Sequence, residues 1–142
     1  QSAFSLEPII IESMQITKSV NGQPPEKDVG QKSSDTMGMK HRVTKAIYVT
    51  YGSISPQLAE KTGFSDDDAV VIKKALVSLF EGDESSARPS GSMQILKLVW
   101  FEHNSKVGQY SSAKVHRSVK VASDGSITIE NLDGLVPEIL EG

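Results

Sequence analysis

A long polar segment between two strand-like segments most limits how this chain can fold. Asn21 to Gly38 reads NGQPPEKDVGQKSSDTMG, and such a composition buries too little apolar surface to offset the entropy lost on ordering. The preceding segment, Ile9 to Lys18, opens with three isoleucines and then alternates through Met14 and Ile16, as a half-buried strand does. We therefore expect a strand, a flexible insertion over residues 20–39, and a second strand.

A basic cluster follows this insertion directly. Lys40, His41, Arg42 and Lys45 place three fixed positive charges and one imidazole within six residues. From Val43 to Tyr51, β-branched and aromatic side chains favour a strand, so the cluster is predicted at a strand start. These cations either hold phosphates or are solvated charges that protect a strand edge from aggregation, and the residues alone leave both interpretations open.

Two helical segments and a loop are predicted next. A short helix is expected after Pro56. A longer helix is expected to begin at Ser65, which caps it while Asp68 occupies the capping-box position, and to end near Gly82. Its apolar side chains recur with helical spacing and form one face. The polar segment Glu81 to Ser92 is expected to be a loop.

The last third of the chain predicts a strand and a hairpin. Met93 to Glu102 has an almost continuous apolar middle, which favours a buried or central strand. Val115 to Val121 and Ser126 to Asn131 alternate and are joined by a Ser-Asp-Gly turn, which predicts a C-terminal hairpin. Residues 132–142 carry no strong signal.

Composition excludes several classes of site. The chain has 142 residues, enough for one domain, and its apolar runs are much shorter than the roughly 20 residues that cross a bilayer, so no membrane partner is expected. Because there are no cysteines, disulfides, thiol nucleophiles and Cys-ligated metals are excluded, and a cytoplasmic location is expected. His41, His103 and His116 have no metal-ligand spacing, so we expect no metal and no cofactor.

The formal net charge is −3, but basic and acidic residues are segregated along the chain. Residues 18–45 hold six basic and three acidic residues, and residues 97–120 hold five basic and one acidic. Residues 122–142 hold five acidic residues and no basic ones. Segregation matters more than the sum for the choice of partner, although chance clustering on a solvated surface stays an alternative.

The predicted order of strand, strand, helix, strand and hairpin is typical of the last three-quarters of a βαββαβ unit. We therefore expect an α+β fold with a ferredoxin-like or RNA-recognition-motif-like antiparallel sheet, in which the first strand and first helix are absent. With these elements the sequence resembles the CRISPR-associated backbone subunit of type I effector complexes, the seventh Cas family, in its type I-C branch. Four blocks carry the resemblance: LEPIIIESMQITKSV, TMGMKHRVTKAIYVTYGSIS, TGFSDDDAVVIKKALVSLFEGDESSAR and LKLVWFEHNSKVG.

The resemblance implies a non-catalytic subunit of Cascade, the type I surveillance complex of antiviral defence. Such subunits polymerise along a CRISPR RNA and hold its sugar–phosphate backbone, while target DNA is read by base pairing with the guide. The implied partners are CRISPR RNA, target DNA through the guide, further copies of the chain and other Cascade subunits. Because family members carry a first strand and a basic helix ahead of this region, residues 1–142 resemble the C-terminal portion of a single RNA-recognition-motif-like domain.

The resemblance also assigns candidate RNA-binding residues and a thumb. The thumb would be the insertion over residues 20–39, which reaches over the neighbouring subunit, and its methionines could equally pack against the strand. The candidate RNA-binding residues are Lys18, Lys40, His41, Arg42, Lys45 and Arg88, and the candidate thumb residues are Val29, Lys32, Met37 and Met39.

Two other functions stay open. An RNA endonuclease related to type III backbone subunits would use an acidic residue, and Asp28 and Asp35 lie in the insertion. Alternatively, exposed strand edges could make the chain a protein-interaction module. In the expected sheet the missing first strand would lie between Val43–Tyr51 and Met93–Glu102, so we expect either these strands to pair directly or a second copy to fill the gap.

Overall fold

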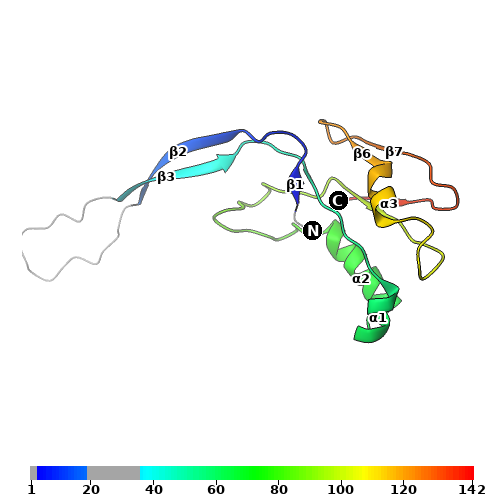
Figure 1. The fold of residues 1–142 in the computed structure, drawn as a ribbon. Helices are drawn as coiled ribbons and strands as arrows, with labels where there is room; N and C mark the ends of the chain where they lie inside the picture. Colours follow the sequence, from blue (N-terminus) through cyan, green and yellow to red (C-terminus); the bar gives the residue numbers. More distant parts are fainter. Residues whose placement is uncertain (1–2, 19–35) are drawn as a thin grey trace, which may run out of the picture. The chain divides into compact units, whose positions relative to one another are not determined.

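The computed structural model describes residues 3–18 and 36–142. These residues form two compact units, Ala3–Val49 and Thr50–Gly142, shown with their helices and strands in Figure 1. The described residues contain three helices and four two-stranded antiparallel sheets. The α+β class predicted from the sequence is therefore confirmed. A ferredoxin-like strand order stays a prediction, because the described strands form four separate pairs.

The first unit consists of two strand pairs. A short pair joins β1 (Phe4–Ser5) to β4 (Tyr48–Val49). The longer pair joins β2 (Ile11–Lys18) to β3 (Thr36–Val43) over eight antiparallel residue pairs. We call this longer pair the β2–β3 ribbon (Figure 1). The predicted strand over Ile9–Lys18 is thus confirmed, with its start at Ile11.

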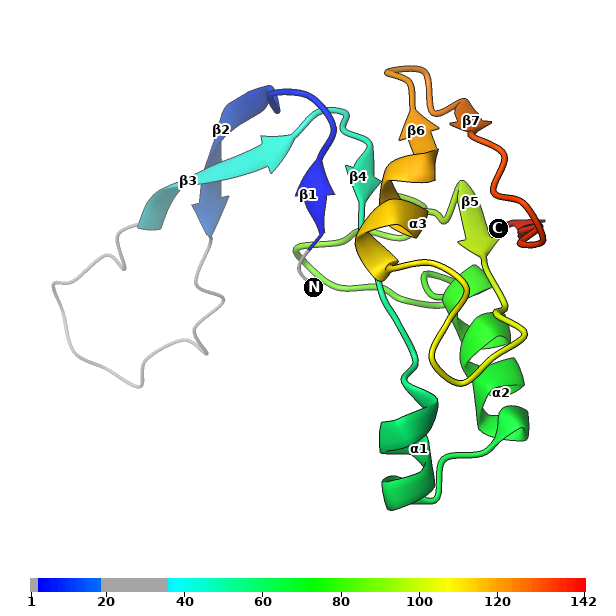
Figure 2. The same ribbon diagram turned by 45° about the vertical axis from the view of Figure 1, so that its right-hand side comes forward.

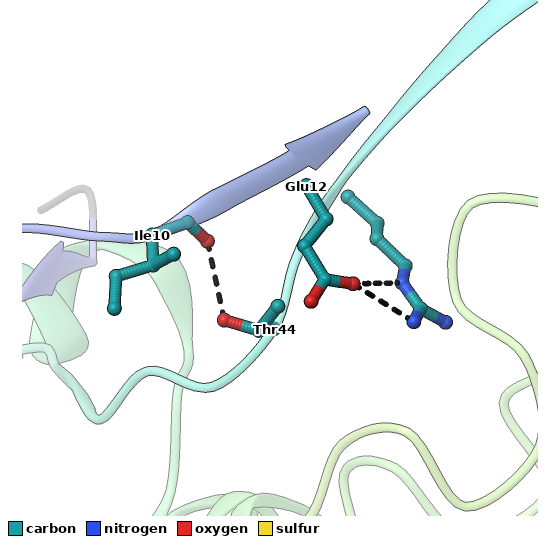
Figure 3. A network of polar contacts seen from close by, with 4 residues as sticks. Ile10, Glu12 and Thr44 are labelled. Carbon is teal, nitrogen blue, oxygen red and sulfur yellow. Dashed lines mark hydrogen bonds and ion pairs between the residues drawn. The ribbon is translucent and has the colours of Figure 1, made fainter. Parts of the chain in front are cut away.

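The prediction of one strand from Val43 to Tyr51 is wrong for most of these residues. Strand β3 ends at Val43, and only Tyr48 and Val49 are in a strand farther on. The ladder closes at Thr44, whose backbone N–H donates to the Ile10 carbonyl oxygen at 3.2 Å. The Thr44 hydroxyl donates to the same oxygen at 3.4 Å (Figure 3). Pairing with the isoleucine-rich β2 therefore moves the strand toward the polar residues before Val43, and this long-range preference overrides local strand propensity.

The same pairing changes the bounds of the predicted insertion. Residues 36–39, assigned to the flexible insertion from composition, lie in β3. Residues 19–35 lie outside the described residues, and with them the predicted thumb residues Val29 and Lys32.

The second unit begins with the two predicted helices. Helix α1 (Pro56–Thr62) follows Pro56 as expected, and α2 spans Asp66–Val77. The capping box is confirmed: the Ser65 hydroxyl accepts from the Asp68 N–H at 3.2 Å, and Asp68 Oδ2 accepts from the Ser65 N–H at 2.8 Å. Helix α2 ends at Val77, earlier than the predicted stop at Gly82, because residues 78–82 form turns.

A short sheet follows the predicted loop. Strand β5 (Lys97–Trp100) pairs with β8 (Glu138–Glu141), and α2 lies against β5. The expectation of a central strand over Met93–Glu102 is wrong within the part of the chain that the structure describes, because β5 has four residues and β8 as its one partner. The C-terminal residues, which gave no signal, supply that partner. None of the described helices is long and apolar enough to cross a membrane.

The predicted C-terminal hairpin is confirmed with shorter strands. Strand β6 (Val119–Val121) pairs with β7 (Ile127–Ile129), and Gly125 in the turn has φ +86°. Residues 115–118, expected in a strand, belong instead to helix α3 (Ser112–Ser118), which runs directly into β6 (Figure 2). The Ser111 hydroxyl caps α3 by accepting from the Lys114 N–H at 3.3 Å.

The core of the second unit lies around α3. Val115, Leu132 and Leu135 are buried, and Phe101 and Tyr110 pack against them. The Tyr110 hydroxyl donates to the Asp133 carbonyl oxygen at 2.9 Å, and the Gln109 side-chain amide donates to the Gly134 carbonyl oxygen at 2.7 Å. These bonds hold the chain that follows β7 against the segment that leads into α3.

Candidate nucleic-acid interface

The register of the β2–β3 ribbon divides the basic cluster between two faces. Glu12 lies opposite Arg42, Ser13 opposite His41, and Met14 opposite Lys40. Side chains alternate along a strand, and directly opposed residues share a face. Lys40 and Arg42 therefore lie on one face of the ribbon and His41 on the other. Contact of these three residues with RNA stays a prediction.

The first of these faces carries the fixed charges, and we call Glu12, Met14, Lys40 and Arg42 the charged face. Arg42 donates from Nε and Nη2 to one carboxylate oxygen of Glu12, at 3.2 and 2.9 Å (Figure 3). The two side chains remain 58% and 51% exposed. An exposed ion pair of this kind contributes little to stability, so Arg42 can exchange this partner for another anion.

The opposite face carries apolar and uncharged polar side chains together with one imidazole. We call it the methionine face, and it consists of Ser13, Gln15, Met37, Met39 and His41. His41 Nδ1 lies 2.8 Å from the Ser13 hydroxyl oxygen. The Gln15 side-chain amide donates to the Met37 sulfur at 3.8 Å. Met37 and Met39 are 64% and 61% exposed, so most of each side chain is open to solvent rather than packed on the strand.

The remaining predicted RNA-binding residues occupy three different settings. Lys18 ends β2 opposite Thr36, and Lys45 is exposed in the bend after β3. Arg88 belongs to the second unit, where Nε and Nη2 donate to the two carboxylate oxygens of Asp83 at 2.7 and 3.2 Å. Arg88 is thus already paired with an acidic residue five positions before it. Its hydrogen bonds lower the pKa of the Asp83 carboxyl, and Asp83 in turn raises the pKa of Arg88.

Sequence reasoning missed Glu12, which forms an ion pair with Arg42. Its charge was visible in the sequence, but its position opposite Arg42 follows only from the register of two strands 30 residues apart. No local pattern reports that register.

The other histidines and carboxylates either contact other residues of the fold or lie too far from one another to form a site. Within residues 3–18 and 36–142, no group of three or more His, Asp or Glu side chains could hold a metal ion. His103 Nδ1 accepts from the Gln109 N–H at 3.0 Å, and the His116 ring stacks on Tyr51 with centroids 4.5 Å apart. Asp28 and Asp35, the acidic residues considered for RNA cleavage, lie outside the described residues.

Comparison with protein families covers most of the chain. Residues 1–134 match the family described as CRISPR-associated protein Cas7, which is more than nine-tenths of the chain. A search of curated proteins finds no match. The match spans both the strand-paired first unit and most of the helical second unit. The chain therefore belongs to the CRISPR-associated Cas7 family, and as such it is a backbone subunit of CRISPR antiviral defence.

Proposed function

We propose that the chain is a non-catalytic backbone subunit of a type I-C Cascade complex and holds the sugar–phosphate backbone of CRISPR RNA on the charged face. The observation that carries this proposal is the placement of Lys40 and Arg42 on one exposed face of the β2–β3 ribbon, in a member of the Cas7 family.

The spacing of these cations suits a repeating anion. Residues i and i+2 of a strand lie about 7 Å apart on the same face, so Lys40 and Arg42 can each contact a different phosphate of an extended strand. Contacts to phosphates fix position and carry no sequence information, which is what a subunit binding any guide requires. Ammonium and guanidinium groups bind phosphate but do not accept a proton at neutral pH, so this chemistry supports binding rather than cleavage.

The methionine face supports the thumb part of the proposal. Met37 and Met39 are exposed, flexible and apolar, and side chains of this kind can wedge between bases. We propose that they meet guide nucleotides while Lys40 and Arg42 meet phosphates on the reverse side. Further partners on this proposal are target DNA through the guide, copies of the chain along the guide and other Cascade subunits, in the cytoplasm.

The proposal is tested by the salt dependence of binding to CRISPR RNA. The double variant Lys40→Ala/Arg42→Ala should weaken binding uniformly over guide sequences. Each lost phosphate contact lowers the slope of log affinity against log salt by about 0.7, so the slope should fall by about 1.4.

The matched control is Lys61→Ala/Lys74→Ala, which removes the same charge from exposed positions on α1 and α2. It should leave affinity and slope near those of the wild type. Wild-type affinity and slope in the Lys40/Arg42 variant would show that these residues are ordinary solvated charges. Incubation with RNA should leave the RNA intact, and cleavage would favour the endonuclease alternative instead.

A further inference from the structure

The second basic zone of the sequence, residues 97–120, is not used by the charged face. The structure divides its five cations into two groups. Lys97 forms an ion pair with Glu141, and Lys106 forms one with Glu60, whose hydrogen bond raises the pKa of Lys106. The other three cations are Lys114, Arg117 and Lys120, and within the described parts of the chain none of them is in an ion pair.

These three cations lie on one continuous element. Helix α3 buries Val115 and Ser118, while Lys114 and Arg117, three residues apart, are exposed neighbours on the helix surface. Strand β6 follows without a break, and its middle residue, Lys120, is exposed and lies opposite Thr128. We call the three residues the α3–β6 cation row (Figure 2 shows the helix running into the strand).

Aromatic contacts hold this element in place. The Lys114 ammonium lies 4.4 Å from the centroid of the Tyr110 ring, and the Tyr110 hydroxyl is bonded to the Asp133 carbonyl oxygen. On the same helix the His116 ring stacks on Tyr51 with an interplanar angle of 17°. The cations therefore project from a packed helix and the strand that follows it rather than from a loop, which reduces the entropy lost when they bind.

Helix electrostatics do not account for the row. A cation in the last turn complements the negative end of the helix dipole, and this explains Arg117. Lys114 is in the first turn, where the dipole disfavours a cation, and Lys120 is in a strand. The helix dipole therefore explains only Arg117, and Lys114 is instead held by its contact with the Tyr110 ring.

We propose that the α3–β6 cation row is a second binding site for the phosphate backbone of a single-stranded nucleic acid, separate from the charged face of the β2–β3 ribbon. Three exposed cations spaced along consecutive residues of one helix and strand form a positively charged surface of the kind that follows the backbone of a single strand. The site does not require the charged face to bind RNA, so it goes beyond the proposed function. Its ligand is the phosphate backbone, which guide RNA and single-stranded DNA share.

The test is filter binding of a short single-stranded RNA, and of a DNA of the same sequence, over a series of salt concentrations. In Lys114→Ala/Arg117→Ala/Lys120→Ala, affinity at low salt should fall on the order of tenfold for at least one strand. The slope should fall by about 2, because three contacts of about 0.7 each are lost. A loss of affinity for RNA alone identifies guide RNA as the ligand. A loss of affinity for DNA identifies single-stranded DNA as a ligand.

Two further variants keep the test decisive. Arg117→Gln/Lys120→Gln retains the contact of Lys114 with Tyr110 and should lower the slope by about 1.4 even where the triple variant folds poorly. The control Lys61→Ala/Lys74→Ala/Lys106→Ala removes equal charge elsewhere and should keep the wild-type slope.

The inference is wrong if folded variants of the row bind both strands with wild-type affinity and slope, or if the wild type binds neither strand at low salt. Lys40→Ala/Arg42→Ala, measured in parallel, separates the two proposals. If Lys40→Ala/Arg42→Ala lowers the affinity and the row variants do not, only the second site is refuted. If the row variants lower the affinity and Lys40→Ala/Arg42→Ala does not, only the proposal for the charged face is refuted.

Discussion

The β2–β3 ribbon and the region around α3 keep their shape by different means. The ribbon has eight backbone pairs, and none of its described side chains is buried. The region around α3 encloses Val115, Leu132 and Leu135 in a small core. A two-stranded ribbon is only marginally stable by itself, whereas a core resists the loss of any one surface group. Substitutions in the ribbon should therefore change binding, whereas truncation of the buried side chains around α3 should first change stability.

The largest expected difference between the two regions comes from truncating one apolar side chain in each. Leu135 is 2% exposed, so Leu135→Ala should lower the free energy of unfolding by about 2–5 kcal/mol. Met39→Ala, in the ribbon, should change it by less than about 0.5 kcal/mol. Urea denaturation of both variants measures this difference. Equal urea midpoints for the two variants would mean that the residues around α3 do not form the core of their unit.

A smaller effect is expected at the capping box of α2. Ser65→Ala removes the side-chain acceptor for the Asp68 N–H and should lower the free energy of unfolding by about 0.5–2 kcal/mol. No function is assigned to this position, so RNA binding should be unchanged. Loss of binding in a folded Ser65→Ala protein would show that the helical unit and the binding surfaces are coupled.

The capping box also predicts a pH dependence. Hydrogen bonds from the Ser65 N–H and hydroxyl lower the pKa of Asp68 below its ordinary value of 3.8. The carboxylate therefore stabilises the folded protein fully above pH 3.8, and this contribution is lost as the pH falls through the lower, folded pKa. Unfolding followed against pH should show less loss of stability in this range for Asp68→Asn than for the wild type.

The smallest effect on stability, paired with a clear effect on binding, is expected at Glu12. Glu12→Gln breaks an exposed ion pair and should change the free energy of unfolding by less than about 0.5 kcal/mol. Because Arg42 is then no longer shared with a carboxylate, affinity for CRISPR RNA should rise. Glu60→Gln, which frees Lys106 on the other unit, is the matched control. An equal rise in affinity in both variants would show that the effect comes from the change in net charge alone.

Local signals predicted several elements correctly. The Ser65–Asp68 capping box, the short helix after Pro56 and the turn at Gly125 each depend on residues a few positions apart. For the same reason the α+β class and the four family blocks were visible in the sequence. Local reasoning was wrong where a strand pairs with a segment far along the chain. The bounds of β5 depend on its pairing with β8, some 40 residues later, and the bounds of β3 depend on its pairing with β2.

The sequence by itself determined the family, the class of fold and which residues carry charge, because composition and short-range patterns encode these properties. Only the tertiary structure decided which charges act together. Strand register placed Lys40 with Arg42, turned His41 to the opposite face and set Glu12 against Arg42. Lys114 and Arg117 on α3 and Lys120 on β6 were left exposed, while Lys97 and Lys106 were paired with distant acids. Such pairings depend on the register and packing of segments far apart in the chain, and no short window of sequence contains both partners.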